Sequence, residues 1–130
     1  MDFLIPLNIS ATRSLLVEKA HSAREIGSGD MDVLATPMLI ALMEAAALAA
    51  VQTYLAAGWS TVGTRVDVEH LRATPLGGKV TAEATLMKRD NRLLEFAVEA
   101  HDNFGLVGQG KHQRFIINQD KFLKKIQGKA

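Results

Sequence analysis

The sequence predicts an α+β fold in which an antiparallel sheet of about five strands wraps around one long apolar helix. Three observations lead to this prediction. The chain of 130 residues is long enough for one domain, residues 1–130, but short for two. Residues 36–51 form one helix-sized, almost wholly apolar stretch. Most of residues 61–118 alternate between polar and apolar side chains, which is the pattern of strands with one buried face.

The overall composition narrows the class of protein. Apolar residues make up 48% of the chain and charged residues 22%, as in ordinary globular proteins. The net charge is +1 and the only concentrated basic run is Lys121–Lys129, so no nucleic-acid partner is expected. The absence of cysteine excludes disulfides, thiol nucleophiles and thiolate metal sites. The first residues lack the pattern of a signal peptide, and we expect a cytoplasmic protein.

The secondary structure of the segment before the long helix is less clearly indicated by the sequence. Residues 1–12 are expected to form an extended lead-in, with Pro6 inside it. Ser14–Ala23 is predicted to be a strand, and the Gly and Ser residues of Glu25–Asp30 predict a flexible loop.

The boundaries of the long helix are well marked. Thr36 is a good N-cap residue, and Pro37 suits the first helical position because its missing N–H does no harm there. The helix is expected to end near Ala57, with Gly58 as the residue after its C-cap.

The second half of the chain is predicted to be a series of antiparallel strands joined by short turns. The expected strands are Thr61–His70, Val80–Leu86, Leu94–Ala100 and Leu106–Ile117. The turn sequences between them are Thr74–Gly78, Asp90–Arg92 and Asp102–Gly105. A short amphipathic helix, capped by Asn118 and carrying Phe122, Leu123 and Ile126, follows the last strand.

The apolar helix also bears on assembly. A helix that is apolar all round is usually buried, yet a single sheet covers only one side of it. We therefore expect a homodimer or a larger assembly that covers the other side. A membrane span is not expected, because the apolar run is short and Glu44 at its centre would cost roughly 3 kcal/mol to insert.

Glu44 is the first candidate for chemistry. A carboxylate is rarely buried without a partner, because removing its charge from water costs several kcal/mol. Catalysis is one reason to keep such a residue. The alternative is a structural carboxylate that pairs with an arginine or a histidine.

Thr36 and His70 are the next candidates. Thr36 is expected to cap the helix, and the partial positive charge of a helix start suits a carbonyl that becomes an oxyanion. His70 ends a predicted strand, where its ring can project into a cleft as a general acid or base. Thr36 and Glu44 lie about 12 Å apart along one helix, so they either line one groove or meet across two chains.

Gly63 and Arg114 complete the candidate set. A glycine inside a strong strand marks a bulge or a close approach of the backbone to a ligand. Arg114 shares a strand face with His112, and it is expected to pair with Glu44 or with an anionic group of a ligand. The histidines show no spacing typical of a metal site.

Taken together, these residues resemble the hotdog-fold acyl-CoA thioesterases, and specifically the fluoroacetyl-CoA thioesterase family. The resemblance covers roughly residues 12–127 and is carried by short segments in the same order. These segments are Val33–Thr36, Leu42–Glu44, Val62–Thr64, Val68–His70, Ala73–Pro75, Ala100–Asp102 and Gly110–Arg114.

The resemblance implies a hotdog fold and hydrolysis of an acyl-CoA substrate. It implies that Thr36, Glu44 and His70 are catalytic and that Gly63 and Arg114 help to hold the acyl group and water. It also implies homodimers or larger assemblies with active sites between subunits, and no metal or other cofactor. Glu44 would then act as a nucleophile or as a general base that activates water.

The sequence departs from the family at two places. The family carries a phenylalanine-bearing lid just before the catalytic threonine, whereas Gly27–Asp32 contains no aromatic residue. Ala45 stands where the family has a tryptophan. Both differences imply a more open pocket for a generic small acyl group. The alternative functions are a non-catalytic acyl-CoA-binding dimer, a hotdog hydratase, and a scaffold with a structural Glu44–Arg114 pair.

Overall fold

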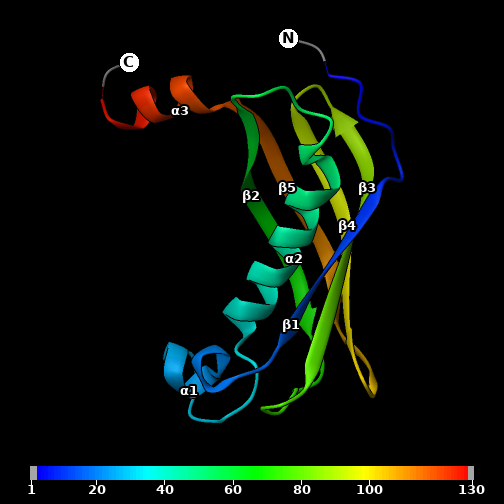
Figure 1. Ribbon diagram of the computed structural model, residues 1–130, viewed down its shortest axis with the longest axis vertical. Coiled ribbons are helices and arrows are strands. Elements are labelled where there is room, and N and C mark those ends of the chain that lie inside the picture. The colour runs from blue at the N-terminus through cyan, green and yellow to red at the C-terminus, as the bar shows by residue number, and fades with distance from the viewer. Residues whose placement is uncertain (1–2, 129–130) are drawn as a thin grey trace.

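The computed structural model describes residues 3–128, which fold into one five-stranded sheet and the helices that accompany it (Figure 1). In chain order the elements are β1 (Ser10–Leu16), the 3₁₀ turn η1 (Lys19–His21), α1 (Ala23–Ile26), α2 (Thr36–Gln52), β2 (Trp59–His70), β3 (Lys79–Asp90), β4 (Leu93–Asp102), β5 (Gly105–Asn118) and α3 (Gln119–Ile126). The strands lie in the order β1-β3-β4-β5-β2, and all neighbours are antiparallel. The predicted α+β class is confirmed.

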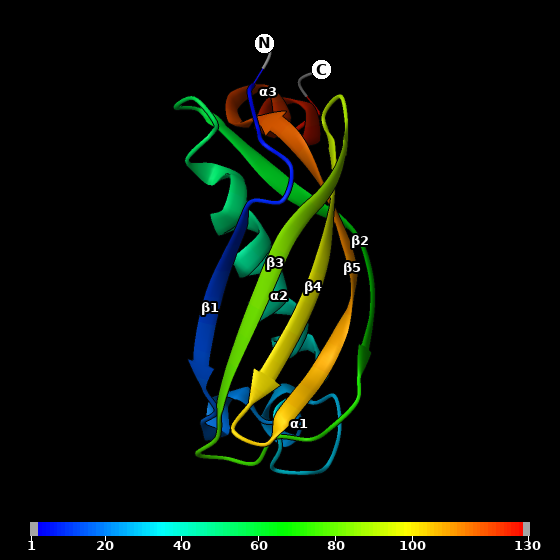
Figure 2. The ribbon, with the colours of Figure 1, turned by 90° about the vertical axis from the view of Figure 1, so that its right-hand side faces the viewer.

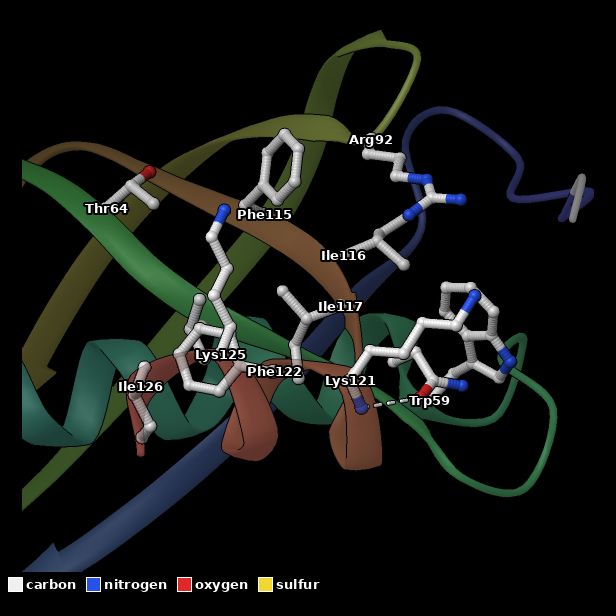
Figure 3. Close-up of a pocket in the computed structure, with 12 residues that line it drawn as sticks. Trp59, Thr64, Arg92, Phe115, Ile116, Ile117, Lys121, Phe122, Lys125 and Ile126 are labelled. Atoms are coloured by element: carbon white, nitrogen blue, oxygen red, sulfur yellow. Dashed lines mark hydrogen bonds between the residues drawn. The ribbon is translucent and has the colours of Figure 1, made fainter. Parts of the chain in front are cut away.

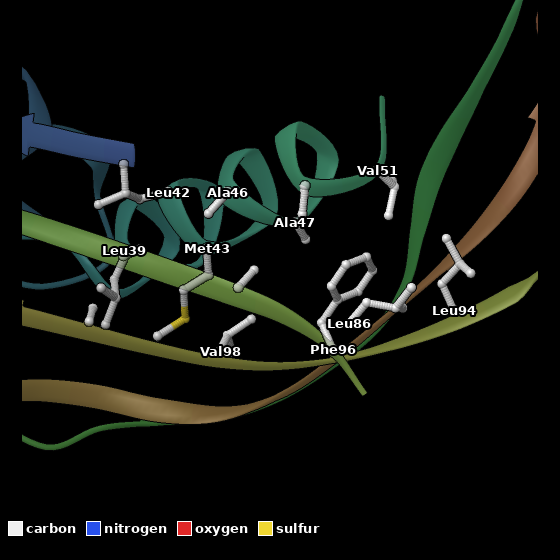
Figure 4. Close-up of a cluster of buried hydrophobic side chains, with 14 of the residues drawn as sticks. Leu39, Leu42, Met43, Ala46, Ala47, Val51, Leu86, Leu94, Phe96 and Val98 are labelled. Atoms are coloured by element: carbon white, nitrogen blue, oxygen red, sulfur yellow. The ribbon is translucent and has the colours of Figure 1, made fainter. Parts of the chain in front are cut away.

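Helix α2 packs along one face of the curled sheet and lies behind the strands in the view of Figure 2. Leucine, methionine and alanine favour helix, and their spacing here places one apolar stripe against the strands. The buried residues of this stripe are Leu39, Leu42, Met43, Ala46, Ala47, Ala50 and Val51. They meet Leu86, Leu94, Phe96 and Val98 of the sheet in the central core (Figure 4). Burial of each of the larger side chains contributes about 1.5–3 kcal/mol.

The other face of α2 is not covered within one chain. Ala41 and Ala45 are exposed, and Glu44 between them is partly exposed. This agrees with the expectation that a single sheet covers only one side of the helix. Along residues 3–128, no helix combines the length and the apolar character that a membrane span requires.

Both ends of α2 differ from the prediction. Ala35, not Thr36, is the N-cap residue, and Thr36 and Pro37 are the first two helical residues. The helix ends at Gln52 rather than near Ala57. The two residues that follow Gln52 are a threonine and a tyrosine, which have a weaker helix propensity than alanine or leucine. Gly58, at a φ of +87°, turns the chain into β2 instead of ending the helix.

The segment before α2 also differs from the prediction. The first strand is Ser10–Leu16 rather than Ser14–Ala23, and it pairs along its whole length with β3. Beyond Leu16 the chain leaves the sheet, and part of the predicted loop forms the short helix α1. Ser22 caps α1, because its hydroxyl accepts the N–H of Glu25 at 3.2 Å.

The remaining strands follow the prediction closely. Each predicted strand between residues 61 and 117 is present, extended by one to four residues at its ends. The predicted cap of the last helix is confirmed, since the Asn118 side chain accepts the Lys121 N–H at 3.1 Å. Lys129, the end of the predicted basic run, lies outside the described residues, as do residues 1–2.

The hairpin that joins β4 to β5 is held by a buried carboxylate. The Asp102 side chain is only 3% exposed and accepts hydrogen bonds from Arg72, from the Thr74 hydroxyl at 3.0 Å and from the Phe104 N–H at 2.8 Å. Burial alone would raise the pKa of Asp102, but these donors and the charge of Arg72 outweigh it and hold that pKa below 3.8.

Substitution Asp102→Asn should lower the free energy of unfolding by about 2 kcal/mol, because it removes charge-assisted hydrogen bonds from a buried site. Urea unfolding at pH 7 measures this change. Asp90→Asn, at the exposed last residue of β3, is the matched control and should change stability by less than about 0.5 kcal/mol. Equal stability of the two variants would contradict the role of Asp102.

Candidate active site

Thr36 and His70 come together, although 34 positions separate them in the chain. Thr36 begins α2 and His70 ends β2, and Thr36 Oγ1 lies 2.8 Å from His70 Nδ1. Both line a cavity of about 300 Å³ at this end of the molecule, together with residues of the loop before α2, such as Ser28, and the segment after β2, such as Arg72. A hydroxyl and an imidazole in hydrogen-bond contact at a cavity are a pair that can transfer a proton.

The second ring nitrogen of His70 has no partner. Nε2 is buried and makes no hydrogen bond to any of the described residues. Burial lowers the pKa of His70 below its ordinary value of 6.5, and the backbone of Arg72 opposes this change in part. The ring is therefore neutral at pH 7, and a buried polar atom without a partner needs a ligand or water to bind it.

Glu44 and Arg114 form an ion pair, as the sequence analysis anticipated. Arg114 Nη1 lies 3.5 Å from Glu44 Oε2. The Arg114 side chain is only 7% exposed, whereas the Glu44 side chain is 40% exposed. Glu44 is thus not the buried carboxylate that the sequence suggested; the open face of α2 leaves it in reach of solvent or a ligand.

Gly63 provides the space in which the Glu44 carboxylate lies. A Cβ atom at position 63 would be 2.5 Å from Glu44 Oε2 and 3.2 Å from His112 Cε1. The predicted irregularity is present, because the register of β2 against β5 shifts between Gly63 and Arg65. Any side chain at position 63 would push the carboxylate away.

The five predicted site residues form two groups in a single chain. Thr36 contacts His70 at one end of α2, and Glu44 lies with Gly63 and Arg114 two helical turns further on. Eight helical residues correspond to about 12 Å along the axis. Among residues 3–128, no hydrogen bond or ion pair joins the two groups.

The sequence analysis did not identify two residues that hold Arg114. Thr61 accepts from Arg114 through both its hydroxyl and its carbonyl oxygen, and His112 faces Arg114 through Nε2. His112 was noted only as a neighbour on the same face. Thr61 could have been found from the alternation of β2, which places it on the same face as Gly63.

A larger cavity lies elsewhere. It measures about 540 Å³ and lies between α3 and the face of β2 and β5 opposite the core (Figure 3). Its walls include Trp59, Phe115, Ile117 and Phe122, with Lys121 and Lys125 among the charged residues. None of the five predicted site residues lines it, so its size alone does not make it the active site.

Comparison with known proteins identifies the family. The family model for the fluoroacetyl-CoA-specific thioesterases matches residues 17–120. The chain belongs to this family of thioester hydrolases. A fluoroacetyl-CoA thioesterase from Streptantibioticus cattleyicolor is 39% identical over 129 residues, covering 99% of this chain and 88% of that protein.

Solved structures agree with the family assignment. A fluoroacetyl-CoA thioesterase variant in complex with acetyl-CoA is 30% identical and superposes with a TM-score of 0.90 over 96% of this chain and 98% of the other. A thioesterase superfamily member from Thermus thermophilus is 25% identical, with a TM-score of 0.88 over 95% and 92% of the two chains. A hot-dog-like protein from Thermanaerovibrio acidaminovorans, 20% identical with a TM-score of 0.86 over 95% and 92%, shares the fold. The expected hotdog fold is confirmed.

The partly buried His70 and the buried His112 predict how the stability of this thioesterase family member changes with pH. Burial lowers the pKa of His70 and of His112 below 6.5 in the folded chain. Below pH 6.5 the unfolded chain therefore binds more protons than the folded chain, and the free energy of unfolding should fall as the pH falls. Near pH 8 these groups are neutral in both states and contribute almost no slope.

Urea unfolding between pH 5 and pH 8 measures this dependence. The variant His112→Gln should weaken the decline below pH 6.5, because one of the two groups is removed. His101→Gln, at an exposed strand position, is the matched control and should keep the decline. A stability that stays constant from pH 8 to pH 5 would contradict the prediction.

Proposed function

We propose that this chain hydrolyses small acyl-CoA thioesters to the free acid and CoA, with Thr36, Glu44 and His70 as the catalytic residues. The observation that carries the proposal is the 2.8 Å contact between Thr36 Oγ1 and His70 Nδ1 at the wall of a cavity. The relatives named fluoroacetyl-CoA thioesterases, and the solved complex of one variant with acetyl-CoA, support the same class of substrate.

Thr36 is the donor that we propose for the thioester carbonyl. Pro37 has no N–H, and the N–H groups of Met38 and Leu39 both donate to the Ala35 carbonyl, at 3.0 and 3.1 Å. The backbone at the start of α2 therefore has few free donors to offer. If His70 Nδ1–H donates to Thr36 Oγ1, the threonine hydroxyl hydrogen is free to bind the carbonyl oxygen as negative charge develops on it.

His70 is the proton carrier in this proposal. Its neutral ring can accept a proton from water or from an acid, and its unpaired Nε2 is the atom that would meet the ligand. The departing CoA thiolate then takes up a proton or leaves as the anion. In one route Glu44 attacks the acyl carbon, the C–S bond breaks to expel CoA thiolate, and water then hydrolyses the resulting mixed anhydride. In the other route Glu44 takes a proton from a water molecule that attacks the acyl carbon and expels the thiolate directly.

Two copies of the chain are needed to bring these residues together. The open face of α2 carries Ala41 and Ala45, and β2 is a long edge strand whose outer edge is unpaired within the chain. Small residues permit close approach of a second helix, and a free edge permits pairing with a second strand. We propose a homodimer, or a dimer of dimers, in which Glu44 of one chain acts with Thr36 and His70 of the other.

The pocket favours a generic small acyl group over fluoroacetyl specificity. Ser28, from the stretch without aromatic residues, lines the cavity that holds Thr36 and His70. Ala45 stands exposed next to Glu44. Without an aromatic lid, nothing on this side selects for fluorine.

A cytoplasmic location stays a prediction of the sequence.

An alternative function is an acyl-CoA-binding dimer that performs no hydrolysis. The Glu44–Arg114 ion pair favours it in one respect, because a paired carboxylate also serves a purely structural purpose. Such a protein would bind acyl-CoA without releasing a thiol.

Purified protein should release CoA thiol from short acyl-CoAs, measured with a thiol-trapping reagent across a series of chain lengths. Glu44→Ala should reduce kcat by at least about 100-fold, because it removes the group that attacks the carbon or activates water. Glu25→Ala, in the exposed helix α1, is the matched control and should keep wild-type activity. Full activity of Glu44→Ala would exclude the mechanism, and tight binding without turnover would favour the alternative function.

Mixing two inactive variants tests whether the site spans two chains. Equal amounts of Thr36→Ala and Glu44→Ala, unfolded and refolded together, should recover about one quarter of the wild-type activity, because half of the dimers are mixed and each holds one intact site. Sites contained in one chain would recover none. Size-exclusion chromatography with light scattering confirms that the mixture is dimeric.

A further inference from the structure

Arg114 is fixed almost entirely by groups other than Glu44. Its Nε donates to Thr61 Oγ1 at 2.7 Å, and its Nη2 donates to the Thr61 carbonyl oxygen at 2.9 Å. Its Nη1 lies 3.1 Å from His112 Nε2. Thr61 is 5% exposed and His112 is 1% exposed, so water does not compete for these bonds. One threonine thus occupies the whole Nε–Nη2 edge of the guanidinium.

The hydrogen bonds of His112 are consistent with only one tautomer. Its Nδ1 lies 2.8 Å from the Arg65 carbonyl oxygen, which can only accept, so Nδ1 carries the proton. Its Nε2 faces Arg114 Nη1, which can only donate, so Nε2 offers a lone pair. The Arg65 carbonyl is available because the strand bulges between Gly63 and Arg65 and the regular ladder is interrupted there.

The contact between Arg114 and Glu44 is long and involves only one nitrogen of the guanidinium. Charge-assisted N–H···O bonds usually measure about 2.7–2.9 Å, and arginine binds carboxylates best with two parallel bonds from one edge. Thr61 already occupies one such edge, and Nη1 is shared with His112. Glu44 is left with one contact, at 3.5 Å.

We propose that Thr61 and His112 are positioning residues that hold Arg114 in place beside Glu44 and prevent a close ion pair between the two. Arg114 then attracts the carboxylate toward the space above Gly63 without binding either oxygen tightly. The carboxylate stays free to reach an acyl carbon or a water molecule. This inference rests on the proposed function, in which Glu44 carries out the chemistry.

Isosteric and conservative substitutions distinguish a positioning role of Thr61 and His112 from a role in stabilising the fold alone. Thr61→Val removes the acceptor hydroxyl but keeps the shape, whereas Thr61→Ser keeps the hydroxyl. His112→Leu removes both nitrogens, whereas His112→Gln keeps a donor and an acceptor. Thr64→Val, an exposed position on the same strand, is the matched control.

Thr61→Val and His112→Leu should lower kcat by about 10- to 100-fold with little change in KM, since a displacement of about 1 Å in a catalytic group has effects of this size. Thr61→Ser and His112→Gln should recover most of the wild-type kcat, and Thr64→Val should match the wild type. Thermal unfolding of each variant identifies any that fail to fold. If His112→Leu does not fold, the Thr61 pair decides the question alone.

A measurement independent of activity accompanies the kinetics. Nitrogen-15 NMR of the wild-type histidine rings at pH 7.5 should show His112 protonated at Nδ1 and unprotonated at Nε2. The opposite tautomer would overturn the inference. So would wild-type kcat in folded Thr61→Val, or equal losses in Thr61→Val and Thr61→Ser, provided that Glu44→Ala is inactive. Activity in Glu44→Ala would instead refute the proposed function itself.

Discussion

The packing of α2 against one face of the curled sheet determines where every candidate site residue lies. The buried stripe that includes Leu39 and Met43 fixes the rotation of the helix about its axis. With that rotation fixed, Glu44 emerges at the border between the covered and the open face and meets Gly63 and Arg114 from the sheet. The same rotation places Thr36, at the helix start, against His70. A slip of one residue in this packing would separate both pairs.

Much of the fold could be predicted because its signals are local. The strands after residue 60 carry strict alternation and turn residues, and the Asn118 cap is a short-range signal, so all of these were predicted correctly. The first strand was misplaced because its residues alternate poorly, and only pairing with β3 selects Ser10–Leu16. The end of α2 was misplaced for a related reason. The apolar run continues beyond Gln52, yet the chain must turn there to reach β2.

The sequence indicated the candidate site residues but not how the fold groups them. Residue types and order indicated Thr36, Glu44 and His70, and strand faces indicated that Arg114 could pair with Glu44. The exposure of Glu44 could not be predicted, since the sequence does not show how much of a helix one sheet covers. Thr61 was not singled out and the burial of Asp102 was not foreseen, because a threonine or an aspartate becomes important only through the arginine that folds against it. Such contacts join strands that are distant in sequence.

The choice of partners for Arg114 has an electrostatic consequence. A buried guanidinium must have its N–H groups bonded, or the cost of removing it from water is not recovered. Carboxylates would satisfy these donors and also cancel the charge. A hydroxyl, a backbone carbonyl and a neutral imidazole satisfy the donors but leave the charge in place. Arg114 therefore keeps a positive field at the Glu44 carboxylate, which water screens only in part because the guanidinium itself is buried. That field favours negative charge wherever it develops beside Glu44, on the carboxylate itself or on an acyl oxygen that binds next to it.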